Sequence, residues 1–302
     1  MRRGAVLGAV LGLGMLSIVV SGQQGGPAAD APKVVEVEKL RENLYMMKGG
    51  GGNTSVFITS TGVVVVDTKN PGWGAPLLEK IRSVTDKPIT MVINTHTHGD
   101  HTSGQLEFPA DIQVVSQANT KANMARLEAY KRPENMKFLP GQTFNDRLSL
   151  LSGPDRIDLY YFGRAHTNGD AWVVFPALRA MQAGDAFAYK DIMRVDANNG
   201  GSVVQYPRTL SNAARLVKDV DTVIAGHTAT TMTMKDLAEY AEFAQAFVNW
   251  GTAQQKAGKT TKEAIAAYQT PARFSGYAAT PARLEEDVAL LYKELEDTKA
   301  PE

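Results

Sequence analysis

Four side chains that bind metal ions well lie within one stretch of six residues, His96-Thr97-His98-Gly99-Asp100-His101. The stretch directly follows the apolar run Met91–Ile93. Alternate side chains of an extended chain share a face, so the first two histidines can converge on one ion. The glycine allows a turn that directs the last two side chains to a second ion nearby. This density of ligands predicts a metal centre rather than structural histidines.

The remaining histidines and two aspartates lie where short apolar runs end. His166 follows Ile157–Phe162, Asp185 follows Met181–Ala183, His227 follows Val223–Ile224, and Asp67 follows Val63–Val66. Such strand ends commonly gather at one edge of a sheet, where ligands bind. All five histidines of the chain therefore lie at predicted strand ends.

The donor atoms restrict the chemistry. The chain has no cysteine, so nitrogen and oxygen atoms must hold any metal, and no thiol can act as a nucleophile. A site of three histidines with an open position is how proteins present catalytic zinc. Two such ions close together can share one water and make it reactive at neutral pH.

The pattern His-x-His-x-Asp-His, followed by a later His, Asp and His, resembles the signature of the metallo-β-lactamase superfamily over about residues 34–233. The resemblance implies an α/β fold, the αβ/βα four-layer sandwich, with the metals at one end of two paired sheets. It implies a first metal bound by His96, His98 and His166, and a second bound by Asp100, His101 and His227. Asp185 would bridge the two, and Asp67 would support the ligand loop without binding metal.

The same resemblance implies a hydrolase with two zinc ions, although iron or manganese would also suit these ligands. A metal-bridging hydroxide would attack an ester, thioester, lactone or amide-like bond of a small-molecule substrate, with β-lactams among the candidates. Asp100 would be the catalytic residue that orients the nucleophile and carries its proton.

Two features bear on the substrate and on an alternative function. The best-known true lactamases have cysteine or serine at the position of Asp185, whereas aspartate resembles the glyoxalase II and lactonase branches. The alternative is an iron-dependent oxidoreductase similar to persulfide dioxygenases, which do not need the complete second ligand set found here. Beyond the ligands, a cation among Tyr189, Lys190 and Arg194 could anchor a carboxylate, or these residues could form a solvated loop.

The glycines at 49–52 predict a mobile hairpin tip rather than a phosphate loop, because no Gly-Lys-Ser/Thr follows.

Charge and the N-terminus indicate where the protein acts. Its 302 residues carry 32 basic and 32 acidic side chains, so neither nucleic acid nor an anionic membrane surface is an expected partner. Arg2 and Arg3, the uncharged run Gly4–Val20 and the small residues after it predict a signal peptide at 1–22. A flexible leader at 23–33 would follow. We therefore expect export to the periplasm or medium, without stable membrane association after cleavage.

The rest of the pattern predicts the elements that position these ligands. Short β-branched runs from Val34 to Val66 indicate an antiparallel meander, and strands then alternate with helices, including one at Gln117–Tyr130. Helical stripes of apolar residues after Thr233 predict a C-terminal extension over 234–302, with packing as their function. The sequence assigns no oligomeric state.

Overall fold

A computed structural model describes residues 32–297 of the chain. The predicted signal peptide, nearly all of the leader and the last five residues of the extension lie outside the described residues. Both sheets, the candidate ligands and the C-terminal helices belong to one compact unit, which begins at Lys33. Within residues 32–297, no helix combines the length and the apolar character that a membrane span requires.

The first sheet begins with the predicted meander. Its strands, in spatial order, are β1 (Glu36–Lys39), β2 (Leu44–Lys48), β3 (Thr54–Ile58), β4 (Val63–Val66), β5 (Ile89–Asn94), β6 (Gln113–Gln117) and β7 (Gln142–Phe144). Strands β1 to β4 pair antiparallel, which confirms the meander, and β4 to β7 pair parallel. The parallel half brings the ends of β4 and β5 to the same edge.

The second sheet has the same mixed character. In spatial order its strands are β12 (Thr222–Ala225), β11 (Ala180–Gly184), β10 (Trp172–Phe175), β9 (Ile157–Tyr160) and β8 (Arg147–Leu150). Only β11 and β12 are parallel neighbours in this sheet; the other pairs are antiparallel. The ends of β11 and β12 therefore also lie at one edge.

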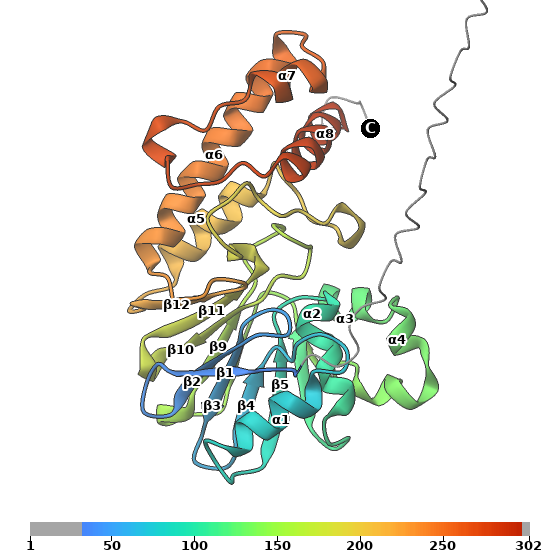
Figure 1. Cartoon of the computed structure of the whole chain (residues 1–302), viewed down its shortest axis with the longest axis vertical. Helices are drawn as coiled ribbons and strands as arrows, with labels where there is room; N and C mark the ends of the chain where they lie inside the picture. Colours follow the sequence, from blue (N-terminus) through green and yellow to red (C-terminus); the bar gives the residue numbers. More distant parts are fainter. Residues whose placement is uncertain (1–31, 298–302) are drawn as a thin grey trace, which may run out of the picture. The chain divides into compact units, whose positions relative to one another are not determined.

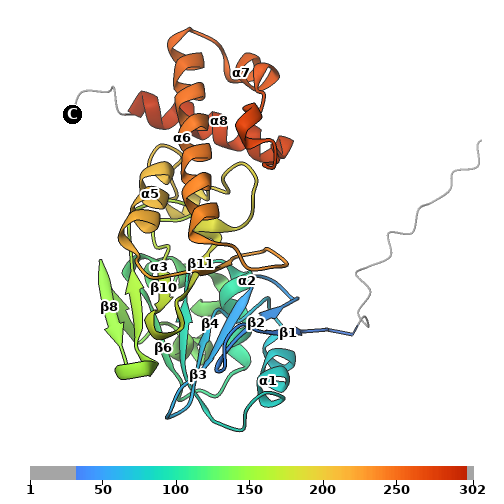
Figure 2. The ribbon, with the colours of Figure 1, turned by 90° about the vertical axis from the view of Figure 1, so that its left-hand side faces the viewer.

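Side-chain alternation explains how the two sheets stack. Val64 and Val66 of β4 point into the core shared with the second sheet, where Phe57 contacts Phe175 edge to face. Val63 and Val65 face the opposite way, toward helix α1 (Gly74–Arg82). Because β4 is covered on both sides, all four valines are buried. Figure 2 shows α1 against the first sheet.

The outer face of the second sheet is covered by helices. Trp172 and Met181 share one apolar core with α5 (Tyr206–Leu216), α6 (Met234–Lys256) and α8 (Pro281–Asp297). The short helix α7 (Thr261–Ala267) lies beside α8 (Figure 1). The order of layers is helix, sheet, sheet, helix, which confirms the αβ/βα sandwich. The apolar stripes of α6 and α8 are packing faces, as predicted.

Two local features differ from the predictions. The helix predicted at Gln117–Tyr130 is divided into α3 (Ala118–Met124) and α4 (Glu128–Lys131), because Leu127 between them is extended. This break lets Leu127 and Tyr130 pack into a small separate apolar cluster. The structure also adds β7 and β8, which contain no continuous apolar run of the kind that marks β4 and β12.

Candidate metal centre

The candidate ligands meet at the edge where the parallel strands of both sheets end. Asp67 follows β4, and the stretch that begins with His96 follows β5 by two residues. Asp185 directly follows β11, and His227 follows β12 by two residues. His166 lies in the connection between β9 and β10. Five chain segments therefore deliver their polar residues to one place.

The first group consists of His96, His98, His166 and Asp185, whose ligand atoms all lie within 4.8 Å of one another. His98 Nδ1 and His166 Nε2 are 2.9 Å apart, and His166 Nε2 lies 3.7 Å from Asp185 Oδ2. The Nε2 atom of His96 is buried and has no hydrogen-bond partner among residues 32–297. Buried polar atoms are nearly always paired, so this nitrogen points to a ligand.

The second group consists of Asp100, His101 and His227. The Nε2 atoms of the two histidines are 3.4 Å apart, and Asp100 Oδ2 lies 3.7 Å from the first and 3.4 Å from the second. Asp185 Oδ1 lies 3.2 Å and 3.1 Å from the same two nitrogens. Asp185 therefore faces one group with each of its oxygens.

These distances fit divalent metal ions. Zinc bonds of about 2.0–2.1 Å in a tetrahedron place neighbouring ligand atoms about 3.3–3.4 Å apart. The triangle of the second group, with sides of 3.4, 3.4 and 3.7 Å, is close to that spacing. The imidazole nitrogens and carboxylate oxygens suit zinc, and they also suit iron or manganese.

The other ring nitrogen of four histidines is held by a neighbour. His98 Nε2 lies 2.7 Å from Asp196 Oδ2, and His101 Nδ1 lies 2.7 Å from Asp67 Oδ2. His96 Nδ1 contacts the hydroxyl of Thr95, and His166 Nδ1 contacts the carbonyl of Arg194. Such partners fix the ring orientation and the tautomer of metal ligands. Sequence reasoning did not find Asp196, because no motif surrounds it.

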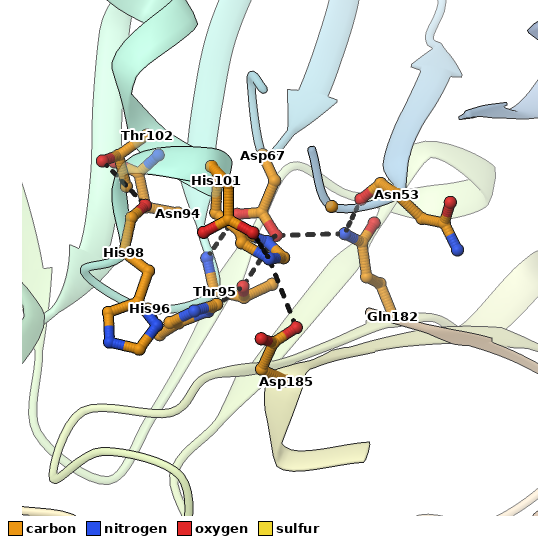
Figure 3. Close-up of polar contacts among 12 residues, drawn as sticks. Asn53, Asp67, Asn94, Thr95, His96, His98, His101, Thr102, Gln182 and Asp185 are labelled. Carbon is orange, nitrogen blue, oxygen red and sulfur yellow. Dashed lines mark hydrogen bonds and ion pairs between the residues drawn. The ribbon is translucent and has the colours of Figure 1, made fainter. Parts of the chain in front are cut away.

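Asp67 occupies a supporting position. In addition to His101, its carboxylate accepts hydrogen bonds from the amide (2.8 Å) and hydroxyl (2.7 Å) of Thr95 and from Gln182 Nε2 (3.3 Å). Figure 3 shows Asp67 on one side of the His101 ring and Asp185 on the other. The carboxylate thereby ties the end of β4 to the loop that follows β5.

Burial and charge set the protonation of the cluster. Burial lowers the pKa of His166 to about 4, against the opposing effect of Asp185, and it holds the pKa of His96 well below its usual range. Burial acts to raise the pKa of Asp185, but His101 holds it well below its usual range. Neutral imidazoles and an ionised carboxylate are the forms that bind metal. His101 differs: burial acts to lower its pKa, but Asp185 and Asp67 raise it to about 10. Because metal binds the neutral imidazole, a cation and a proton would compete for His101.

The sequence profile of the metallo-beta-lactamase superfamily matches residues 47–227, which include every candidate ligand. The chain belongs to the metallo-beta-lactamase superfamily. It is 27% identical over 254 residues to the metallo-beta-lactamase type 2 of Elizabethkingia meningoseptica, covering 77% of this chain and 94% of that protein. Members of the superfamily bind metal ions, and the fold is that of metal-dependent hydrolases.

Solved structures share the fold at low identity. A metallo-beta-lactamase from Pontibacter korlensis superposes with a TM-score of 0.59 at 18% identity, over 70% of this chain and 99% of that chain. A stereoselective inverting sec-alkylsulfatase from Pseudomonas sp. superposes with a TM-score of 0.69 at 13% identity, over 86% of this chain and 50% of that chain. At these identities the comparison concerns the fold alone.

The glycine-rich tip between β2 and β3, residues 49–52, packs against the ligands. The amide of Gly52 donates to the carbonyl of Asp100 at 3.1 Å. A Cβ atom on Gly52 would lie 2.0 Å from the His101 ring, and one on Gly51 would lie 2.5 Å from the Asp100 carbonyl. Lys69 Nζ is buried and donates to the carbonyls of Met47 and Gly52, at 2.6 Å each. The predicted hairpin between β2 and β3 is confirmed, and contacts at both ends of its tip pack it against the ligands.

Tyr189, Lys190 and Arg194, the residues considered for substrate binding, have different surroundings. Lys190 pairs with Asp236 at 2.7 Å and with Glu239 at 3.6 Å on α6, so its charge is already neutralised away from the ligands. Arg194 Nη1 lies 3.3 Å from Asp185 Oδ2, and its side chain remains 40% exposed. A cavity of about 390 Å³ beside His98 and His166 is lined by Arg194. Tyr189 lies near His227, with ring centroids 6.3 Å apart.

Proposed function

We propose that the protein is an exported hydrolase that holds two divalent ions, with zinc as the metal, in the two ligand groups that share Asp185. The position of that carboxylate is the observation that carries the proposal. Its Oδ1 lies 3.1–3.2 Å from two nitrogens of the second group, and its Oδ2 faces the first group. One side chain placed in this way can hold two ions at the short separation that dinuclear hydrolases use.

When bound, the two ions would supply a water of lowered pKa and polarise the bond under attack. The side chains of this protein then have separate tasks. Asp100 is at the edge of the cluster with 23% of its side chain exposed, so it can accept the proton of the attacking water. The buried Asp67 and the half-buried Asp196 keep the His101 and His98 rings in place during turnover.

The bond that we propose is an ester, thioester, lactone or amide-like bond of a small molecule. The similarity to a type 2 metallo-beta-lactamase over 94% of its length supports the amide-like bond of β-lactams as the first to test. Arg194, beside the cluster and partly exposed, supports a substrate that carries an acidic group.

The test combines elemental analysis of the purified protein with a hydrolysis panel of nitrocefin, a lactone, a thioester, a phosphodiester and a secondary alkyl sulfate. We expect two zinc ions per chain and turnover of one class. His98→Ala and Asp185→Ala should lose metal and activity together, by at least a hundredfold in kcat/KM. Asp111→Ala, which removes an exposed carboxylate remote from the cluster, should change neither.

Two results would contradict the proposal. Full activity of Asp185→Ala would exclude the shared-ligand arrangement. A single iron without hydrolysis of any panel member would favour the iron-dependent oxidoreductase instead. Export has its own measurement: mass spectrometry of the protein from the periplasmic fraction should find a mature N-terminus near Gln23, and an intact Met1 in the cytoplasm would contradict it.

A further inference from the structure

The connection between Asp185 and α5 is hydrogen-bonded to the C-terminal helices at two points. At the first point, Asp191 accepts hydrogen bonds from the hydroxyl of Thr280 and from Arg283 Nη1, the latter at 2.6 Å. The backbone of Ala278 also pairs with that of Lys190 and Ile192. The start of α8 is therefore joined to the segment that directly follows the shared ligand.

The second fastening lies at the far end of α8. Glu294 Oε2 accepts hydrogen bonds from Ser202 Oγ and from the amide of Val204, at 2.9 Å each. Between the two fastenings, the connection carries Arg194 and Asp196 to the metal cluster. Helix α8 thus fixes the segment that forms one side of the cavity beside the first ligand group.

Helix α8 also contributes side chains to that cavity. The space of about 390 Å³ is lined by His98 and His166 and by the connection from Arg194 to Asn198. Leu290 and Glu286 of α8 are the lining residues from the C-terminal extension. Leu290 is partly buried and packs on the core of the helices, whereas Glu286 is exposed.

The cavity has an ordered arrangement of charge. Arg194 provides a cation next to the ligands, and its guanidinium has more donors than its contact with Asp185 uses. The carboxylate of Asp196 also lines the cavity, but it is already bonded to His98, Asn198 and Asn199. Val195 and Leu290 provide apolar surface, and Glu286 of α8 provides an exposed anion. An acidic group is therefore favoured beside Arg194 and disfavoured beside Glu286.

We propose that α8 is a wall of the substrate-binding cavity and selects amphiphilic monoacids. The substrate would have its acidic group at Arg194, an apolar portion on Leu290, and an uncharged or cationic far end beside Glu286. The inference rests on the proposed hydrolase function and assigns to the C-terminal extension a part in specificity.

The proposed placement of charges can be tested by isothermal titration calorimetry on the zinc-loaded protein. The ligands are three acids with the same eight-carbon chain: octanoate, 8-aminooctanoate and octanedioate. We expect octanedioate to bind at least tenfold more weakly than the other two at low salt. Glu286→Lys should remove or reverse this order, and 0.5 M salt should reduce it. Glu285→Lys is the matched control, because this neighbour on α8 is exposed and does not line the cavity. Equal affinities for the three acids, or the same response in both variants, would overturn the proposal.

A second variant tests the wall itself. Leu290→Trp adds volume to a partly exposed position, so the fold should tolerate it. All three acids should bind at least tenfold more weakly, while metal content and thermal midpoint stay unchanged. Unaltered binding would contradict the role of α8. If the protein hydrolyses a panel substrate but fails these binding tests, only the present inference fails. Absence of metal and of all hydrolysis would instead remove the proposed function.

Discussion

At the residue scale, the centre depends on side chains that hold ligands in place. Asp196 is the one that contacts His98, and its carboxylate also accepts from the amides of Asn198 and Asn199. Hydrogen bonding to His98 is the main cause that lowers the pKa of Asp196 well below its usual range. The residue is therefore ionised at neutral pH and orients the imidazole from behind.

Asp196→Ala should weaken binding of the first metal by about 10- to 100-fold, the usual effect of losing a partner of a ligand histidine. The second metal should be affected much less, because its ligands do not contact Asp196 in the described part of the chain. Titration of metal-free protein with zinc measures both steps. Asp196→Asn keeps an acceptor for His98 and should recover most of the affinity. An equal loss at both steps would indicate a general structural defect instead.

Asp196 supports the site through its side chain, whereas at Gly52 the site requires that no side chain is present. A Cβ atom there would lie 2.0 Å from Cε1 and 2.3 Å from Nε2 of His101. Gly52→Ala should therefore displace His101 and weaken the second metal selectively, by tenfold or more. Gly141→Ala is the matched control, because no atom lies within 4 Å of its added Cβ. Elemental analysis after dialysis should find about one ion in the first variant and two in the control; two in both would contradict the steric argument.

At the scale of elements, the β2–β3 tip is fastened from below by Lys69. Its ammonium group bridges the carbonyl of Met47, two residues before the four glycines, and the carbonyl of Gly52, the last of them. Burial lowers the pKa of Lys69 to about 7, against the opposing effect of Asp67. A lysine in this state can still donate two hydrogen bonds as a neutral amine.

Lys69→Met should release the tip and speed hydrogen exchange of the amides at 49–53. It should also change how stability depends on pH. Between pH 7 and about 10 the unfolded chain binds more protons than the folded one at this residue, so its contribution to stability rises with pH. The free energy of unfolding of the wild type relative to Lys69→Met should therefore increase from pH 7 to 9. Lys121→Met, at an exposed position, should show no such slope; a slope equal to that of the control would contradict the low pKa.

At the scale of the whole folded unit, one core joins the second sheet to the C-terminal helices. Tyr240 of α6 stacks on Phe187 next to Asp185, with ring centroids 5.1 Å apart. The metal cluster, with its buried histidines and carboxylates, lies at the edge of this core. Without a bound ion, buried polar atoms such as His96 Nε2 have no partner among the described residues.

Chelation should therefore destabilise the whole unit. An ion held at a thousand times its dissociation constant stabilises the folded state by about 4 kcal/mol. We expect the thermal midpoint to fall by on the order of 10 °C in EDTA, measured by scanning calorimetry and restored by added zinc. The control is Asp185→Ala, which lacks the shared ligand and should respond little. An unchanged midpoint of the wild type would show that metal binding and folding are not linked.

The sequence by itself determined the superfamily, the layered sandwich and which side chains could bind metal. These features have local signatures: the spacing of His96 to His101, polar residues at the ends of apolar runs, and the helical stripe that begins at Leu237. The ligands came together in the structure because strand ends that share an edge are close regardless of the chain between them.

Only the tertiary structure decided which residues hold the ligands in place and which residues line the cavity. Asp196 and His98 are 98 residues apart, and Glu294 and Ser202 are 92 residues apart. Lys69 has no partner within its own segment that would distinguish it from a surface lysine. Periodicity and motif spacing report on geometry within one segment, whereas these contacts arise from sheet pairing and helix packing between distant segments. The part of α8 beside the metal centre could therefore be seen only in the folded chain.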